Sequence, residues 1–215
     1  MKADIKLISG GVYQTGLSDD PCRIIAFDEI EVFYDAYWSS LGEWTFSSSP
    51  RSRGYYYRTP PKFFLKDAIM LREEPLTINE LKVFRPDLPF RLCRNKQINW
   101  TGELFPEMLI FSDELNRMGL NISNEIVLPV LQITLQPYGP QGGAMKSTLV
   151  TSLSAEGFSF IELLWLAHNI QAPYLRGNQE KGVDVFRSGH EKDIPAYYIG
   201  GFYDSNLLYS KGRIK

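Results

Sequence analysis

Residues 159–172, with the sequence SFIELLWLAHNIQA, decide the fold because they specify a helix at both of its ends. Ser159 and Glu162 have the spacing of a capping box, in which each side chain satisfies a free backbone N–H at the helix start. Pro173 lacks an N–H and disfavours helical geometry in the residue before it. We therefore expect one helix that begins after Ser159 and ends at residues 170–172.

Apolar side chains cover most of the circumference of this helix, over an arc of roughly 260° at 100° per residue. Only Glu162 and Asn169 form a polar strip. A surface helix needs an apolar stripe of little more than about 100°, so this helix is expected to be buried in the core or shared with a partner. His168 falls inside the apolar arc and is expected to be a core histidine bonded to a backbone carbonyl.

The remaining elements are mostly strands. Residues 126–136 alternate apolar and polar side chains as a half-buried antiparallel strand does, and 145–153 return as its hairpin partner. A second capping box predicts a helix over 77–84, and 112–118 predict another short helix. The predicted fold class is therefore α+β, a mainly antiparallel sheet packed on the buried amphipathic helix at about 159–172, with one or two further short helices.

Residues 29–38 predict a long strand with one apolar face and one mixed face. Residues 178–193 are largely polar and are expected to form a long loop with a short strand at 183–186. We expect a single domain over 1–215, with a possible subdivision into a β-rich part, 1–100, and a hairpin–helix part, 101–215.

Composition narrows the class of protein. A hydrophobic content of 44% is ample for a sizeable core. Cys22 and Cys93 show no metal or redox spacing, which favours reduced thiols and a cytoplasmic location. The sequence has no apolar run of about 18 residues, so we expect neither a signal peptide nor a membrane partner. No metal and no cofactor are expected. The loop 137–143 and the residues after it lack the glycine positions of a phosphate-binding loop, which favours a hairpin loop.

The charge is unevenly distributed, although its net value of −2 excludes a strongly basic protein. Residues 1–50 carry 3 basic and 8 acidic side chains, a net charge of −5. Residues 51–98 carry 11 basic and 5 acidic side chains, a net charge of +6. Residues 99–215 carry 9 basic and 12 acidic side chains, a net charge of −3. The basic segment 51–98 is therefore the most distinctive surface feature.

Arginines and tyrosines alternate in this basic segment. Such a pattern suits an anionic protein partner, for which Arg, Tyr and Trp are common anchors, and it also suits single-stranded nucleic acid, although less well. A structural alternative pairs the arginines with the acidic strand 29–35. The candidate partner-binding residues are Arg51, Arg53, Tyr55, Tyr57, Arg58, Lys62, Arg94 and Lys96.

We therefore hypothesise a non-enzymatic cytoplasmic interaction or assembly protein that binds a protein partner or its own copy through this Arg/Tyr-rich surface. The alternatives are binding of single-stranded nucleic acid and a small hydrolytic enzyme. For the enzyme, His190 in the polar loop would act as the acid or base with a nearby carboxylate, Asp184, Glu191 or Asp193.

Overall fold

The computed structural model describes residues 6–40, 42–44, 57–139, 143–175 and 181–201. Its contacts group the chain into two compact units. Unit 1 comprises residues 1–87 and 188–193, and unit 2 comprises residues 88–187 and 194–215. The predicted α+β class with mainly antiparallel pairing is confirmed. The single-domain organisation stays a prediction.

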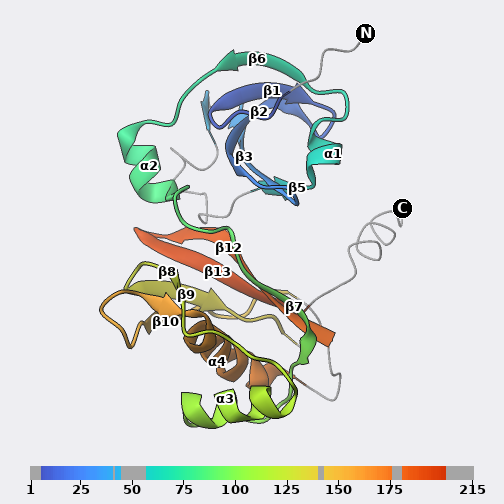
Figure 1. Cartoon of the computed structure of the whole chain (residues 1–215). Helices are drawn as coiled ribbons and strands as arrows, with labels where there is room; N and C mark the ends of the chain where they lie inside the picture. Colours follow the sequence, from blue (N-terminus) through green and yellow to red (C-terminus); the bar gives the residue numbers. More distant parts are fainter. Residues whose placement is uncertain (1–5, 41, 45–56, 140–142, 176–180, 202–215) are drawn as a thin grey trace. The chain divides into compact units, whose positions relative to one another are not determined.

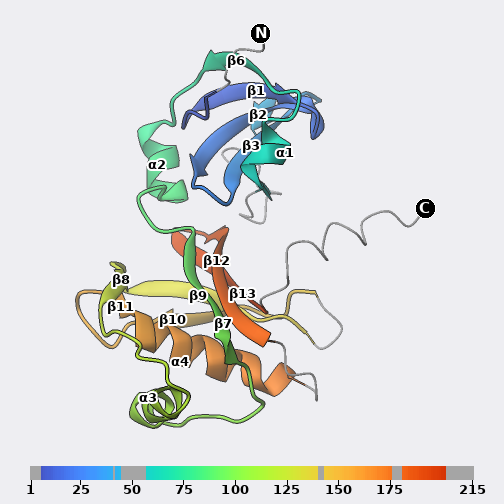
Figure 2. The ribbon, with the colours of Figure 1, turned by 45° about the vertical axis from the view of Figure 1, so that its right-hand side comes forward.

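Unit 1 is built on an antiparallel sheet with the strand order β4-β3-β2-β1-β6, in which β5 also pairs with β3. Figures 1 and 2 show the longer strands curling round a common centre, and Figure 1 shows α1 beside β5. The strands are β1 (Gly11–Thr15), β2 (Ser18–Phe27), β3 (Val32–Trp38), β4 (Glu43–Trp44), β5 (Tyr57–Thr59) and β6 (Ile69–Glu73), and the helices are α1 (Pro61–Phe64) and α2 (Ile78–Phe84).

A hydrophobic cluster of unit 1 joins residues of β1, β2 and β3 to α1. Proline at the first position of α1 starts a single helical turn, because its missing N–H would be unpaired there in any case. That turn brings Phe64 against Tyr13, with ring centroids 5.5 Å apart. The buried residues of this cluster are Tyr13, Cys22, Ile24, Val32, Phe64 and Ala68.

Unit 2 contains a five-stranded sheet with the order β10-β9-β13-β12-β7. Only the β13/β9 pair is parallel among the pairings described in this sheet. The strands are β7 (Arg91–Asn99), β9 (Gln132–Gln136), β10 (Thr148–Thr151), β12 (Lys181–Glu191) and β13 (Ile194–Gly201), with β8 (Ile126–Leu128) and β11 (Phe158–Ser159) as a separate pair. The helices are α3 (Met108–Arg117) and α4 (Phe160–Gln171), followed by the 3₁₀ turn η1 (Ala172–Tyr174).

Helix α4 begins where the capping pattern predicts. The Ser159 side chain accepts a hydrogen bond from the backbone N–H of Glu162, at 3.3 Å. The Glu162 carboxylate does not lie in an exposed polar strip, because it is buried and accepts from the backbone N–H of Leu153 at 2.7 Å. The Glu162 side chain thus connects α4 to the segment after β10 through a hydrogen bond.

Apolar residues of α4 belong to the hydrophobic core of unit 2. Leu163 and Leu164 are in the same buried cluster as Ile133 of β9 and Val185 of β12. Figure 2 shows α4 running below the sheet, with α3 beyond it. His168 is buried, and its Nε2 lies 2.9 Å from the Glu103 carbonyl oxygen, which confirms the core histidine. None of the helices in the described ranges is long and apolar enough to cross a bilayer.

Two expectations for the second half of the chain have different outcomes. The hairpin is confirmed for β9 and β10, which pair antiparallel with Val150 opposite Ile133, but residues 126–128 of the predicted strand form β8, which pairs with β11 instead. The short strand predicted at 183–186 is confirmed, but the polar loop expected around it is wrong, because the chain forms the eleven-residue strand β12 over 181–191. Its buried alternate positions include Val183 and Val185, which pack in the core, and the strand pairs with β7.

Candidate binding site

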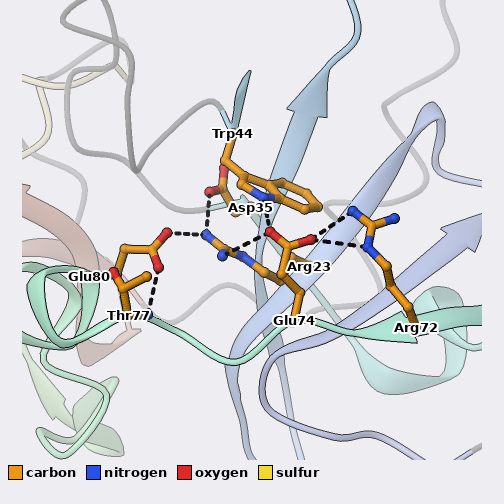
Figure 3. Close-up of polar contacts among 7 residues, drawn as sticks. All are labelled: Arg23, Asp35, Trp44, Arg72, Glu74, Thr77 and Glu80. Carbon is orange, nitrogen blue, oxygen red and sulfur yellow. Dashed lines mark hydrogen bonds and ion pairs between the residues drawn. The ribbon is translucent and has the colours of Figure 1, made fainter. Parts of the chain in front are cut away.

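Arg23 is the buried centre of an ion cluster in unit 1, which Figure 3 shows in close-up. The antiparallel register of β2 and β3 sets Arg23 directly opposite Asp35. Their side chains are 2% and 0% exposed, and the guanidinium Nη2 lies 3.6 Å from the Asp35 carboxylate. A buried charge is strongly unfavourable unless it is paired, so the partners of Arg23 decide whether this arrangement is stable.

Helix α2 supplies the second carboxylate. Thr77 and Glu80 form a complete capping box, with the Thr77 N–H 2.8 Å from Glu80 Oε2 and the Glu80 N–H 3.2 Å from Thr77 Oγ1. The other carboxylate oxygen of Glu80 accepts a hydrogen bond of 2.6 Å from Arg23 Nη2. The cap therefore fixes Glu80 in the orientation that Arg23 requires.

Glu74 supplies the third carboxylate and connects the cluster to Trp44. The indole N–H of Trp44 donates to Glu74 at 2.7 Å, and Arg72 donates to the same carboxylate at 2.7 and 3.1 Å. The Arg23 guanidinium lies 4.7 Å from the centre of the Trp44 ring, within cation–π range. Trp44 is thus held from two directions.

Both outer carboxylates are held in their charged form. Burial alone raises the pKa of Glu80, but its hydrogen bonds with Thr77 and Arg23 and the Arg23 charge outweigh this effect, so the pKa lies below its ordinary value. The pKa of Glu74 is also lowered, because the bonds from Trp44 and Arg72 and the two arginine charges outweigh burial.

An open cavity of about 410 Å³ borders the cluster. Arg23, Glu74 and Glu80 are among its lining residues. The guanidinium already faces three carboxylates, which makes the cavity a poor receptor for an anion. Within the described ranges, no three His, Cys, Asp or Glu side chains are grouped so that they could hold a metal ion. We interpret the cluster as a structural element that fixes Trp44.

Trp44 in turn supports a second, aromatic site. Tyr37 on β3 pairs with Trp44 on β4, and their rings meet edge to face at 5.3 Å. Tyr37 also lines an open pocket of about 400 Å³, which has four aromatic residues of β3 and β5 in its lining. We call it the aromatic pocket, and its lining residues are Leu17, Ser18, Asp20, Tyr34, Ala36, Tyr37, Trp38 and Tyr57.

The strand geometry explains why these rings converge. Tyr34, Ala36 and Trp38 alternate along β3 and therefore share one face of the sheet. Tyr57 on β5 is the direct register partner of Tyr34, and the two rings stack with centroids 5.5 Å apart and planes inclined by 24°. Trp38 is 40% exposed and Tyr57 is 45% exposed, so both present apolar surface to solvent.

The predicted partner-binding residues are distributed over both units. Tyr57 lines the aromatic pocket, and Lys62 is exposed on α1. Arg58 lies 3.7 Å from Glu31, which agrees with the structural alternative of pairing with the acidic strand. Arg94 is exposed on β7 in unit 2. Arg51, Arg53 and Tyr55 and the side chain of Lys96 lie outside the described part of the chain.

The predicted acid–base residues lie in β12 and the turn after it, so the expected loop location of His190 is wrong. His190 Nδ1 is 2.9 Å from the Lys192 carbonyl oxygen. Asp184 forms an ion pair with Arg91 on β7 and belongs to unit 2, whereas His190, Glu191 and Asp193 belong to unit 1. Hydrolytic activity stays a prediction.

Both cysteines are free and buried. Burial raises the pKa of the Cys22 thiol to about 11. The hydrogen bond with Thr15 lowers the pKa, whereas the nearby carboxylates of Asp35 and Asp20 raise it further. Because the thiolate is the reactive species, Cys22 is a core residue and a poor nucleophile.

Comparisons with known proteins add no function to this geometry. No protein-family model, curated protein or solved structure matches the chain. The function has to be inferred from the residues alone.

The alternating pattern predicted that Tyr34 and Trp38 lie on the apolar face of a strand, but it did not indicate that the outer end of this face is open. It also missed the Arg23 cluster, in which Arg23 and Glu80 are 57 positions apart.

Proposed function

We propose that the protein is a non-enzymatic binding protein that holds a protein partner through the aromatic pocket of unit 1. The observation that carries this proposal is the convergence of four aromatic side chains on one open pocket, two of them at least 40% exposed. Tyr and Trp are enriched among the residues that dominate the energy of protein interfaces. A pocket of about 400 Å³ is also within the usual range for a bound group.

The support around the pocket also favours binding. A site is precise when the rings that contact the ligand are themselves fixed by neighbours. Tyr37 packs on Trp44, whose indole N–H is bonded to Glu74, and Tyr34 is stacked on Tyr57. Ordered rings lose little conformational entropy on binding, which lowers the cost of association.

Of the Arg/Tyr-rich surface inferred from the sequence, this proposal retains Tyr57 as a direct contact. Arg58 is assigned to its pair with Glu31. A cytoplasmic location belongs to the same proposal and is supported by two free, buried thiols. Self-association is the competing form of the proposal and is measured directly by light scattering.

The test compares proteins captured from native lysate by the immobilised wild type and by three variants. Trp38→Ala and Tyr57→Ala each remove a ring from the pocket, and we expect a partner affinity at least 10-fold lower, as for an interface anchor. Tyr57→Phe keeps the ring and is expected to retain the partner. Leu149→Ala, at a 53% exposed residue of β10, is the control. Equal capture by the wild type and both alanine variants, with unchanged thermal melts, would overturn the proposal.

A further inference from the structure

We propose that the group taken by the aromatic pocket is a cationic side chain of the partner, the ammonium of a lysine or the guanidinium of an arginine in an exposed peptide segment. This inference rests on the proposed function and adds the chemistry of the ligand. It follows from three features: the aromatic character of the lining residues, the sign of their charge and the contacts that two cations of the basic segment make.

Four aromatic residues line the pocket. The face of an aromatic ring carries partial negative charge, and a cation within about 6 Å of its centre is attracted. Tyr34, Tyr37, Trp38 and Tyr57 all line one volume of about 400 Å³. Tyr34 and Tyr57 are register partners on β3 and β5, and their stacking fixes each ring against the other.

The charge of the lining is negative. Among the described lining residues the only charged side chain is Asp20, on β2. The Asp20 backbone N–H donates to the Ser18 hydroxyl at 3.1 Å, and the Asp20 carboxylate accepts a hydrogen bond from the Ser39 hydroxyl. A carboxylate fixed beside aromatic faces complements an ammonium or guanidinium group.

Two described cations of the basic segment, in and just after β5, make contacts of their own. Arg58 follows Tyr57 in β5, so its side chain points to the opposite face of the strand, where it pairs with Glu31. The Lys62 ammonium lies 5.0 Å from the centre of the Phe63 ring. Apart from Tyr57, the described lining residues belong to residues 1–50, which carry 8 acidic and 3 basic side chains.

This charge distribution decides against the two other ligand classes that aromatic pockets accept. Single-stranded nucleic acid needs cations for its phosphates beside the stacking rings, and here the charge beside the rings is a carboxylate. A purely apolar segment would bury Asp20 without pairing it, which is unfavourable. A basic peptide satisfies both the rings and the carboxylate.

The test follows the indole N–H signal of Trp38 by NMR while end-blocked pentapeptides are added to the full chain. The probes are Gly-Gly-Lys-Gly-Gly, Gly-Gly-Arg-Gly-Gly, the trimethyl-lysine form of the first, Gly-Gly-Glu-Gly-Gly and an eight-residue oligothymidylate. We expect saturable shifts with the cationic peptides and none with the glutamate peptide or the oligonucleotide. Added salt should weaken the cationic binding, because it screens exposed charges.

Two variants test the assigned groups. Asp20→Asn should lower the affinity for the arginine peptide about two- to fivefold, as expected for an exposed charge pair. Trp38→Leu, followed through the backbone signals of β3, should lower it about two- to thirtyfold, the range of cation–π contacts. Leu149→Ala should leave it unchanged. The peptide comparison on the wild type does not depend on how the variants fold.

The outcomes separate this inference from the proposed function. Equal or stronger shifts with the glutamate peptide or the oligonucleotide, or no shift with any probe, would overturn the cationic ligand. If lysate capture still depends on Trp38 and Tyr57 in that case, the pocket binds a partner through other chemistry. If capture is also indifferent to both residues, the inference and the proposed function fail together.

Discussion

At the scale of single residues, Arg23 has the largest consequences in unit 1. It is 2% exposed and faces Asp35, Glu74 and Glu80. Such a buried ion pair is not necessarily better than an apolar pair of similar volume, but removing one partner leaves an uncompensated buried charge. Asp35, which is fully buried, would then lose its ion pair with Arg23.

We therefore expect Arg23→Met to lower the free energy of unfolding by about 3–5 kcal/mol. The matched control is Arg72→Met, at a side chain that is 53% exposed and also bonded to Glu74. Its loss should be about 1 kcal/mol or less. Urea unfolding of both variants at pH 7 measures the difference. Similar small losses for the two would mean that Arg23 is not needed to compensate Asp35.

The same cluster predicts acid sensitivity. The pKa of Glu80 is below its ordinary value of 4.5, so the unfolded chain takes up a proton at higher pH than the folded chain does. The stabilisation is therefore complete above about pH 4.5 and is lost as the pH falls through the folded pKa. Glu80→Gln should be less stable at pH 7 and should lose stability less steeply below pH 5. Urea melts from pH 7 to pH 3 that run parallel for the two proteins would contradict this expectation.

At the scale of elements, locally coded features were predictable and long-range features were not. The start of α4 follows from Ser159, and the first turn of α2 follows from Thr77 and Glu80, because a cap depends on residues three positions apart. Only residues 183–186 of strand β12 were predicted as a strand and the rest as a polar loop, because the strand pairs with β7, about 90 residues earlier. The candidate site shows the same division.

The aromatic residues of the candidate site were visible in the sequence, but their arrangement was not. The alternation through Tyr34 and Trp38 predicted one apolar face, and Tyr57 was singled out among the basic residues. Whether that face is covered depends on which segments pack over it. Inner positions of the sheet face Phe64 of α1, whereas the outer end forms the pocket. Periodicity along one strand does not carry this information.

Helix α4 gives a prediction at this scale. Leu164 is 1% exposed and packs in the cluster that includes Ile133 of β9. Leu164→Ala should lower the free energy of unfolding by about 2–5 kcal/mol, because it removes buried contacts and leaves a cavity. Leu109→Ala is the control, since Leu109 of α3 is 68% exposed. A loss below about 1 kcal/mol for Leu164→Ala in denaturant melts would show that this face of α4 is not core.

At the scale of the whole molecule, the division into units gives a test of the single-domain prediction. Unit 1 includes residues 188–193, which follow most of unit 2 in the sequence. We expect both units to unfold in one cooperative transition, as most domains of moderate size do. Amide exchange in β2 and in α4 should then lose protection at the same urea concentration. Loss of protection at two clearly different concentrations would show two independent domains.

The pairing of β7 with β12 also has a consequence for the newly made chain. Cys93 lies opposite Val185 in the sheet, 92 positions later in the sequence. At a synthesis rate of roughly 5–20 residues per second, β7 leaves the ribosome about 5–20 s before its partner exists. An unpaired strand edge is a template for pairing with other chains. During this period the β7 edge of the nascent chain is open to pairing with other chains. Either a chaperone or a low local concentration of nascent chains has to prevent that pairing.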